Sequence, residues 1–246
     1  MKEIFLTKKE KDTVTVYWTA KTIPQRQTYS QLLWGPPVPV SKTLPHGTGK
    51  EGNYRSCAAL TPMLKNMYTF IHPLTHSARI SGDHDNPVLE AELNVWGAQR
   101  NDPLKNCYGI DYDFNWLFFC EESVEIKVTP PYFHQTSVSQ SAYIASGQFD
   151  ISKWFRSVGL SYILWEGQHS ISITAGEPAL YIEFLTNKKV ILQPFECTEE
   201  INSIANQVVT SSQFGMSKTS LEQRYGLFFR SNRHKRVLKL IRENLL

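Results

Sequence analysis

The sequence predicts a mainly β protein, an antiparallel β-sandwich or jelly-roll-like fold with a C-terminal helical appendage. Between residues 88 and 195, short segments that alternate apolar and polar side chains are separated by clusters of Gly, Pro, Asn and Asp, with no long helix between them. After Phe195 the apolar period lengthens from two to about 3.6 residues, which indicates helices. A double-stranded β-helix is a variant of this fold class that the pattern leaves open. The predicted strands are Val88–Val95, Tyr108–Phe119, Val124–Thr129, Ser141–Phe149, Leu160–Trp165, Ser170–Thr174, Ala179–Leu185 and Lys189–Phe195.

A first strand and a long irregular arm precede this region. Thr13–Thr19 alternates strictly and predicts a strand. Residues 23–54 are rich in proline, which removes ladder donors, and in glycine, so they predict an irregular arm. Apolar residues such as Trp34 favour an arm that packs across one end of the core. Ser56–Met67 has helical spacing, and Tyr68–Ile71 has the alternation of a strand.

Turn residues organise the later strands. Ala175–Pro178 and Thr186–Lys188 are short turns between predicted strands, so the last three strands are expected to follow one another as a meander. Residues 147–156 predict the end of a strand followed by a single helical turn. The apolar side chains of this segment are expected to fill the core: Phe149, Ile151, Trp154 and Phe155.

The C-terminal part carries the uneven charge of the chain. We place the β domain at residues 1–197 and the helical appendage at 198–246. Helices are predicted at Glu199–Val209 and from about Arg233 to Leu245, and overlapping capping boxes at Thr219 and Ser220 predict a further helix start. Seven of the protein's Lys and Arg lie within residues 221–246, against two Glu. The last helix has one apolar arc, expected to dock on the body, and an opposite cationic arc formed by Lys235, Arg236, Lys239 and Arg242.

Composition restricts the compartment and the partners. No apolar run approaches the roughly 20 residues that cross a bilayer, so no membrane span is expected. The first ten residues are too charged for a signal peptide, and we expect a cytoplasmic protein. The four cysteines are widely spaced and are expected to be thiols. The cationic arc suits an acidic protein or a nucleic acid, and the oligomeric state stays open.

No catalytic signature accompanies the predicted sheets. The sequence contains no P-loop and no Gly-x-Ser-x-Gly elbow. The iron oxygenases that occupy double-stranded β-helices need His-x-Asp or His-x-Glu, which none of the seven histidines provides, and His-x-His is also absent. We therefore predict no cofactor. Iron or another transition metal enters only under the alternative of a divergent cupin-like or oxygenase-like enzyme, for which the weak ligand candidates are His84, Asp85, His134 and His169.

Four stretches carry a resemblance to a known group of proteins. They are Ser56-Cys57 leading to residues 65–68, Phe149–Arg156, Gly176–Pro178 with Tyr181–Phe184, and the basic tail Tyr225–Ile241. In these the chain resembles uncharacterised proteins of tailed phages, particularly phages of marine cyanobacteria. Those proteins often have proline directly after the cysteine, where this chain has Ala58. The resemblance implies a viral protein made in a bacterial host cytoplasm, and it implies no activity.

The leading hypothesis is therefore a non-catalytic phage-type protein with a binding or assembly role. The absence of catalytic motifs motivates it. The metal-dependent barrel enzyme is the first alternative, and a nucleic-acid-binding accessory protein that uses the basic last helix is the second.

Overall fold

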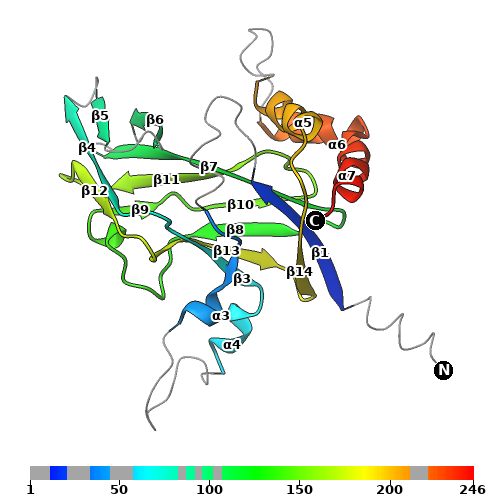
Figure 1. The fold of residues 1–246 in the computed structure, drawn as a ribbon, viewed down its shortest axis with the longest axis horizontal. Coiled ribbons are helices and arrows are strands. Elements are labelled where there is room, and N and C mark those ends of the chain that lie inside the picture. Colours follow the sequence, from blue (N-terminus) through cyan, green and yellow to red (C-terminus); the bar gives the residue numbers. More distant parts are fainter. Residues whose placement is uncertain are drawn as a thin grey trace.

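The computed structural model is a sandwich-like β protein with helices at the C-terminal end (Figure 1). It describes residues 12–20, 34–44, 58–82, 87–91, 96–101, 107–210 and 221–246. The mainly β, antiparallel sandwich fold with a C-terminal helical appendage is confirmed. Within the described residues the strands form open sheets rather than a closed barrel.

The first sheet contains the longest strand. Its members are β1 (Thr13–Ala20), β6 (Trp96–Asn101), β7 (Tyr108–Cys120), β9 (Ala142–Ile144), β11 (Val158–Leu164) and β14 (Lys189–Pro194). The order is β14-β1-β7-β11-β9, and β6 also pairs with β7. β1 and β14 run parallel, whereas the other pairs of this sheet are antiparallel. β7 is therefore central, with partners along both edges.

The second sheet faces the first. Its members are β2 (Val38–Pro39), β3 (Met67–Ile71), β8 (Glu125–Thr129), β10 (Gly147–Asp150) and β13 (Pro178–Leu185), in the order β10-β8-β13-β3-β2. The strand predicted over residues 141–149 is thus two strands, β9 and β10, which belong to different sheets. The bend between them carries the chain across the sandwich.

A third, smaller sheet lies at one end of the sandwich (Figure 1). It has the order β12-β4-β5, formed by β4 (His76–Gly82), β5 (Pro87–Ala91) and β12 (Ser170–Ile173). The meander was wrong, because β12, β13 and β14 belong to three different sheets. The turn after β12 bonds to the segment after β3 instead: the Gly176 amide donates to the His72 carbonyl and the His72 amide to the Glu177 carbonyl. These bonds carry the chain into the second sheet.

The main core lies between the two large sheets. Phe70 of β3 meets Trp116 of β7 at 4.6 Å between ring centroids, and Phe118 meets Phe184 of β13 at 5.9 Å. Ile151 joins this core, as expected. Burial of these side chains is the main source of stability for such a fold.

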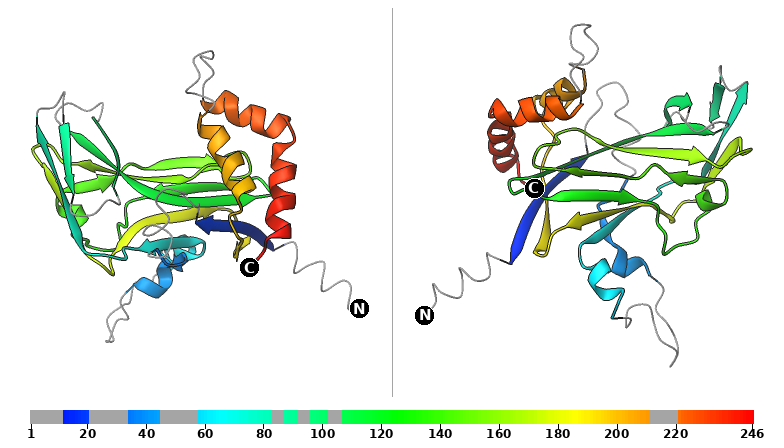
Figure 2. Two further views of the ribbon diagram at one scale, coloured as in Figure 1. Left: turned by 45° about the horizontal axis from the view of Figure 1, so that its top comes forward. Right: turned by 180° about the vertical axis from the view of Figure 1, so that it is seen from behind.

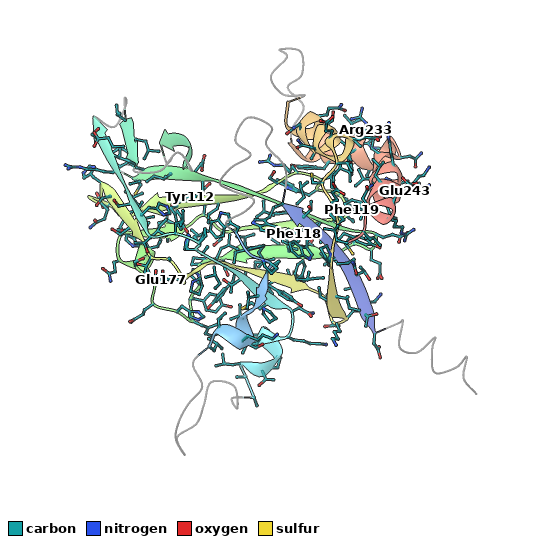
Figure 3. All side chains as sticks on the ribbon, in the orientation of Figure 1. Tyr112, Phe118, Phe119, Glu177, Arg233 and Glu243 are labelled. Carbon is teal, nitrogen blue, oxygen red and sulfur yellow. The ribbon has the colours of Figure 1, made fainter. Side chains whose placement is uncertain are left out.

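A second apolar cluster lies on the outer face of the first sheet. Successive residues of a strand point to opposite faces, so Phe118 points into the sandwich while Phe119 points to the helices (Figure 3). The helices are α5 (Glu199–Thr210), α6 (Leu221–Arg230) and α7 (Arg233–Glu243), and they cover one end of this sheet (Figure 2). As predicted, α7 docks by its apolar arc, with Val237 and Ile241 fully buried. Phe155 belongs to this cluster and not to the main core.

The end of the chain returns to the sheet. The Leu246 amide donates to the Pro194 carbonyl at 3.1 Å, and the Glu196 amide donates to the Asn244 carbonyl at 2.9 Å. Leu245, placed in the last helix by the sequence pattern, instead forms a bridge with Phe195. The C-terminal end of the appendage is therefore bonded to the end of β14, next to the point where the appendage begins.

Two short helices cover the outer face of the second sheet. They are α3 (Val40–Thr43), within the arm, and α4 (Thr61–Leu64). Val40 is fully buried and packs with Met67 and Tyr181, while Trp34 reaches the main core. The helix expected up to Met67 stops earlier, because Met67 pairs with Glu183 as part of β3.

The cysteines match the expectation where they are described. Cys107 and Cys120 are buried thiols and Cys197 is half-buried, while Cys57 lies outside the described residues. Burial raises the pKa of the Cys120 thiol to about 11.

Candidate functional site: a groove between the sandwich and the helices

A groove of about 770 Å³ lies where the end of β10 meets helix α6. This volume is in the range that small-molecule sites occupy. The residues that line it come from two segments some 70 positions apart in the chain: Phe149, Asp150, Lys153, Trp154, Gln223, Tyr225, Gly226 and Arg230. The groove exists only because the appendage docks on the sandwich.

Three aromatic rings form one wall. Phe149 stacks on Trp154 with 4.5 Å between centroids and 28° between planes, and Trp154 stacks on Tyr225 of α6 at 4.2 Å and 25°. The tight turn after β10 presents Trp154, because its backbone amide bonds back to the Asp150 carbonyl at 2.9 Å. The Trp154 Nε1–H is buried and has no hydrogen-bond acceptor among the described residues. The stack joins the sandwich to the helices and buries the Trp154 Nε1–H.

The one carboxylate among the described lining residues is already compensated. Asp150 accepts hydrogen bonds from the Ser152 and Ser123 hydroxyls at 2.6 and 2.7 Å, and Lys153 Nζ lies 2.9 Å from it. Partial burial works against ionisation, but these bonds outweigh it and lower the pKa of Asp150. Asp150 is thus ionised, and its charge and that of Lys153 offset each other.

Arg230 provides the uncompensated charge. Its Nε donates to the Gly226 carbonyl at 3.3 Å, and no carboxylate in the described part of the chain pairs with it. A Cβ on Gly226 would stand 3.2 Å from Arg230 Nη2, closer than most real contacts. The glycine therefore lets the guanidinium fold back along α6 at the side of the groove. A second cation, Arg156, lies over the Trp154 ring at 4.9 Å.

A buried histidine–tyrosine cluster is the other concentration of polar side chains. His72 Nε2 and the Tyr162 hydroxyl are 3.0 Å apart, and His76 Nε2 bonds the Tyr112 hydroxyl (Figure 3 labels Tyr112). Burial, followed by the neighbouring His76, lowers the pKa of His72 to about 3. Burial also raises the pKa values of both tyrosines. At neutral pH the His72 ring and both tyrosine hydroxyls are uncharged, and the cluster fastens the β3–β4 connection to β7 and β11.

The structure does not bring the four candidate metal ligands together where it describes them. His134 bonds the Tyr181 hydroxyl and, through Nε2, the Thr43 carbonyl at 3.2 Å. His169 instead packs its ring on Tyr108 at 5.4 Å. His84 and Asp85 lie outside the described residues. Among the described residues, no group of three His, Cys, Asp or Glu is placed to hold a metal ion.

Carboxylates face most of the predicted cationic arc of α7. Arg236 Nε donates to Glu200 of α5 at 3.0 Å, and Arg242 Nη2 to Glu121 after β7 at 2.6 Å. Lys239 lies 3.8 Å from Glu243 in the same helix. Lys235 is exposed and has no ion pair within the described residues. The arc is on the surface, as predicted, and its binding role stays a prediction.

The sequence pattern did not reveal the groove. The sequence pattern predicts Trp154 as a core residue and not as part of a site. Tyr225, Gly226 and Arg230 carried no site signal. The one available hint was an aromatic residue, a mid-helix glycine and an arginine within six positions.

Comparison with known proteins adds no relative. No protein-family model, curated protein or solved structure matches the chain significantly. None of the helices within the described residues is long and apolar enough to span a bilayer.

Proposed function

We propose that this chain is a non-catalytic binding protein and that the groove between β10 and α6 is its ligand site. The observation that carries the proposal is the groove itself, a space of about 770 Å³ walled by stacked aromatic rings and edged by a guanidinium group. Concave, mostly apolar spaces with a few placed polar groups are the usual form of ligand sites. The phage context and a cytoplasmic location, both expected from the sequence, are part of this proposal.

The chemistry of the groove favours binding over catalysis. The described lining residues include one carboxylate and no Cys, His, Ser or Thr. The hydroxyls and the ammonium group around Asp150 stabilise its ionised form, which makes it a weak proton acceptor at neutral pH. The described lining residues therefore offer surface, stacking and charge, but no activated nucleophile or base.

The test is a binding screen against a groove-filling variant. A set of small anionic, neutral and cationic aromatic compounds is screened by ligand-observed NMR against the full chain. Gly226→Leu, which places a side chain in the groove, is expected to abolish binding of the hits. Lys239→Leu, an exposed α7 change outside the groove, is the matched control and should bind them unchanged. Hits that bind Gly226→Leu as well as the wild type would refute the assignment of the site.

A further inference from the structure

We propose that the ligand of this groove is an anion with a flat apolar body, whose acidic group contacts Arg230 and whose body lies against the Phe149–Trp154–Tyr225 wall. This inference rests on the proposed function and adds the chemical class of the ligand. It covers aromatic phosphates, sulfonates and carboxylates.

The charge balance of the groove selects an anion. Asp150 and Lys153 form an ion pair at 2.9 Å, and two serine hydroxyls satisfy the carboxylate further. Arg230 is left with a full positive charge and no opposite partner in the described part of the chain. A planar guanidinium beside an apolar wall binds phosphate, sulfonate or carboxylate through paired N–H donors.

The placement of Arg230 is specific. A glycine inside a helix costs stability relative to alanine, yet α6 has Gly226 one turn before Arg230. The space left by the missing Cβ is the space that the guanidinium approaches. The Nε–H···O bond to the Gly226 carbonyl then holds the head group against the helix, beside the groove. The acidic group of a ligand would meet a cation that is already positioned.

The aromatic wall determines the rest of the ligand. Phe149 and Trp154 are half-buried, so each has surface left beyond the stack. Flat apolar groups pack well against such rings. Arg156 over the indole increases the positive potential there.

The experiment uses two matched dyes with the full-length protein. 8-Anilinonaphthalene-1-sulfonate is the anionic probe, and N-phenyl-1-naphthylamine is its neutral analogue without the sulfonate. Fluorescence titration is expected to show one saturable site for the anionic dye. Arg230→Gln should lower the affinity of the protein for the anionic dye roughly tenfold, because a charge-assisted contact is lost. The same variant should change the affinity of the neutral dye less than about twofold.

Two further variants test whether the effect of Arg230→Gln comes from the site itself or from a general change in charge or folding. Lys235→Gln removes the same charge from the exposed face of α7, and it should leave both affinities unchanged. Gly226→Ala should weaken binding of the anionic dye, because the added Cβ would stand 3.2 Å from Arg230 Nη2 and the head group must shift by a few tenths of an ångström.

The outcomes distinguish the two proposals. If Gly226→Leu abolishes dye binding but Arg230→Gln leaves the anionic dye unaffected, the groove is the site and the anion assignment is wrong. If neither substitution alters the binding of either dye, both the site and the ligand class are overturned. A Lys235→Gln effect equal to that of Arg230→Gln would show nonspecific charge attraction and would also overturn the ligand class.

Discussion

His72 shows how burial determines the chemistry of a single residue. Its ring is 1% exposed, packs on Trp34 at 5.2 Å and bonds Tyr162 through Nε2. Charging this imidazole would place a cation in an apolar interior, which is costly. The sequence shows only two histidines four residues apart. The neutral state of His72 follows from the surroundings that the fold supplies.

The depressed pKa of His72 predicts acid destabilisation. An unfolded chain protonates this histidine below about pH 6.5, whereas the folded protein does so only near pH 3. The contribution of His72 to stability is therefore present above pH 6.5 and is lost as the pH falls towards 3. By pH 5 the loss should reach about 2 kcal/mol.

Urea unfolding of the wild type and of His72→Gln at pH 7 and pH 5 measures this effect. The glutamine cannot ionise and can still bond Tyr162, so the variant should lose less stability between the two pH values. Near-UV circular dichroism checks that the variant is folded at pH 7. An identical loss in both proteins would contradict the buried neutral state of His72.

At the scale of elements, β7 and α7 explain how the appendage is attached. The end of β7, from Trp116 to Cys120, is apolar on both faces because the sandwich covers one face and the helices cover the other. The apolar arc of α7 completes that second cover, with Val237 and Ile241 inside. The appendage is thus part of the packing of the first sheet.

Truncation of two neighbouring β7 side chains should distinguish the contribution of the main core from that of the second apolar cluster. Phe119→Ala and Phe118→Ala each remove a ring that is 2% exposed, at an expected cost of about 3–5 kcal/mol. Hydrogen exchange should show that Phe119→Ala loses protection first in α5–α7, whereas Phe118→Ala loses it first in the two sheets. The same order of loss in both variants would mean that the sheets and helices unfold as one unit.

The ion pairs on α7 limit what its cationic arc contributes. Exposed pairs such as Arg236–Glu200 and Arg242–Glu121 are worth less than about 1 kcal/mol each. The four cations can therefore be replaced by glutamine together with the fold retained. If α7 binds nucleic acid, this variant should lose affinity for a short duplex at about 50 mM salt, where electrostatic attraction is strong. Equal binding by wild type and variant would exclude the arc as the contact surface.

The whole molecule depends on the junction between sandwich and appendage. The end of β14 is bonded to the last residues of the chain. The sandwich and the appendage both contribute residues to the second apolar cluster and to the lining of the groove. The last strand ends at Pro194 and the first helix of the appendage begins at Glu199, while the division into two parts near residue 197 stays a prediction. The shared cluster argues that the two parts fold together.

Deletion of residues 198–246 tests this dependence. The shortened chain would expose Leu117, Phe119, Phe155 and Phe195, which are buried in the full protein. Such an apolar patch promotes aggregation. We expect a lower melting temperature and self-association in analytical ultracentrifugation. A monomer as stable as the full chain would show that residues 1–197 form an independent domain.

Local features of the protein follow directly from its amino-acid sequence. Alternation along Lys189–Pro194 and Val158–Leu164, and the helical period of α5 and α7, are properties of neighbouring residues, so these elements were predictable. The docking arc of α7 was predictable for the same reason. The helix expected up to Met67 failed because pairing with Glu183, far along the chain, outweighed local spacing.

Strand pairing and the position of the groove depend on contacts between distant segments of the chain. Turn residues connect consecutive strands but do not determine which strand each one pairs with, so the predicted meander was wrong. The parallel pairing of β1 with β14 was not foreseen for the same reason. The groove needs Trp154 and Tyr225 stacked across the junction and Arg230 folded over Gly226. These are contacts between segments far apart in sequence. Their energies depend on packing and burial, which no local pattern encodes.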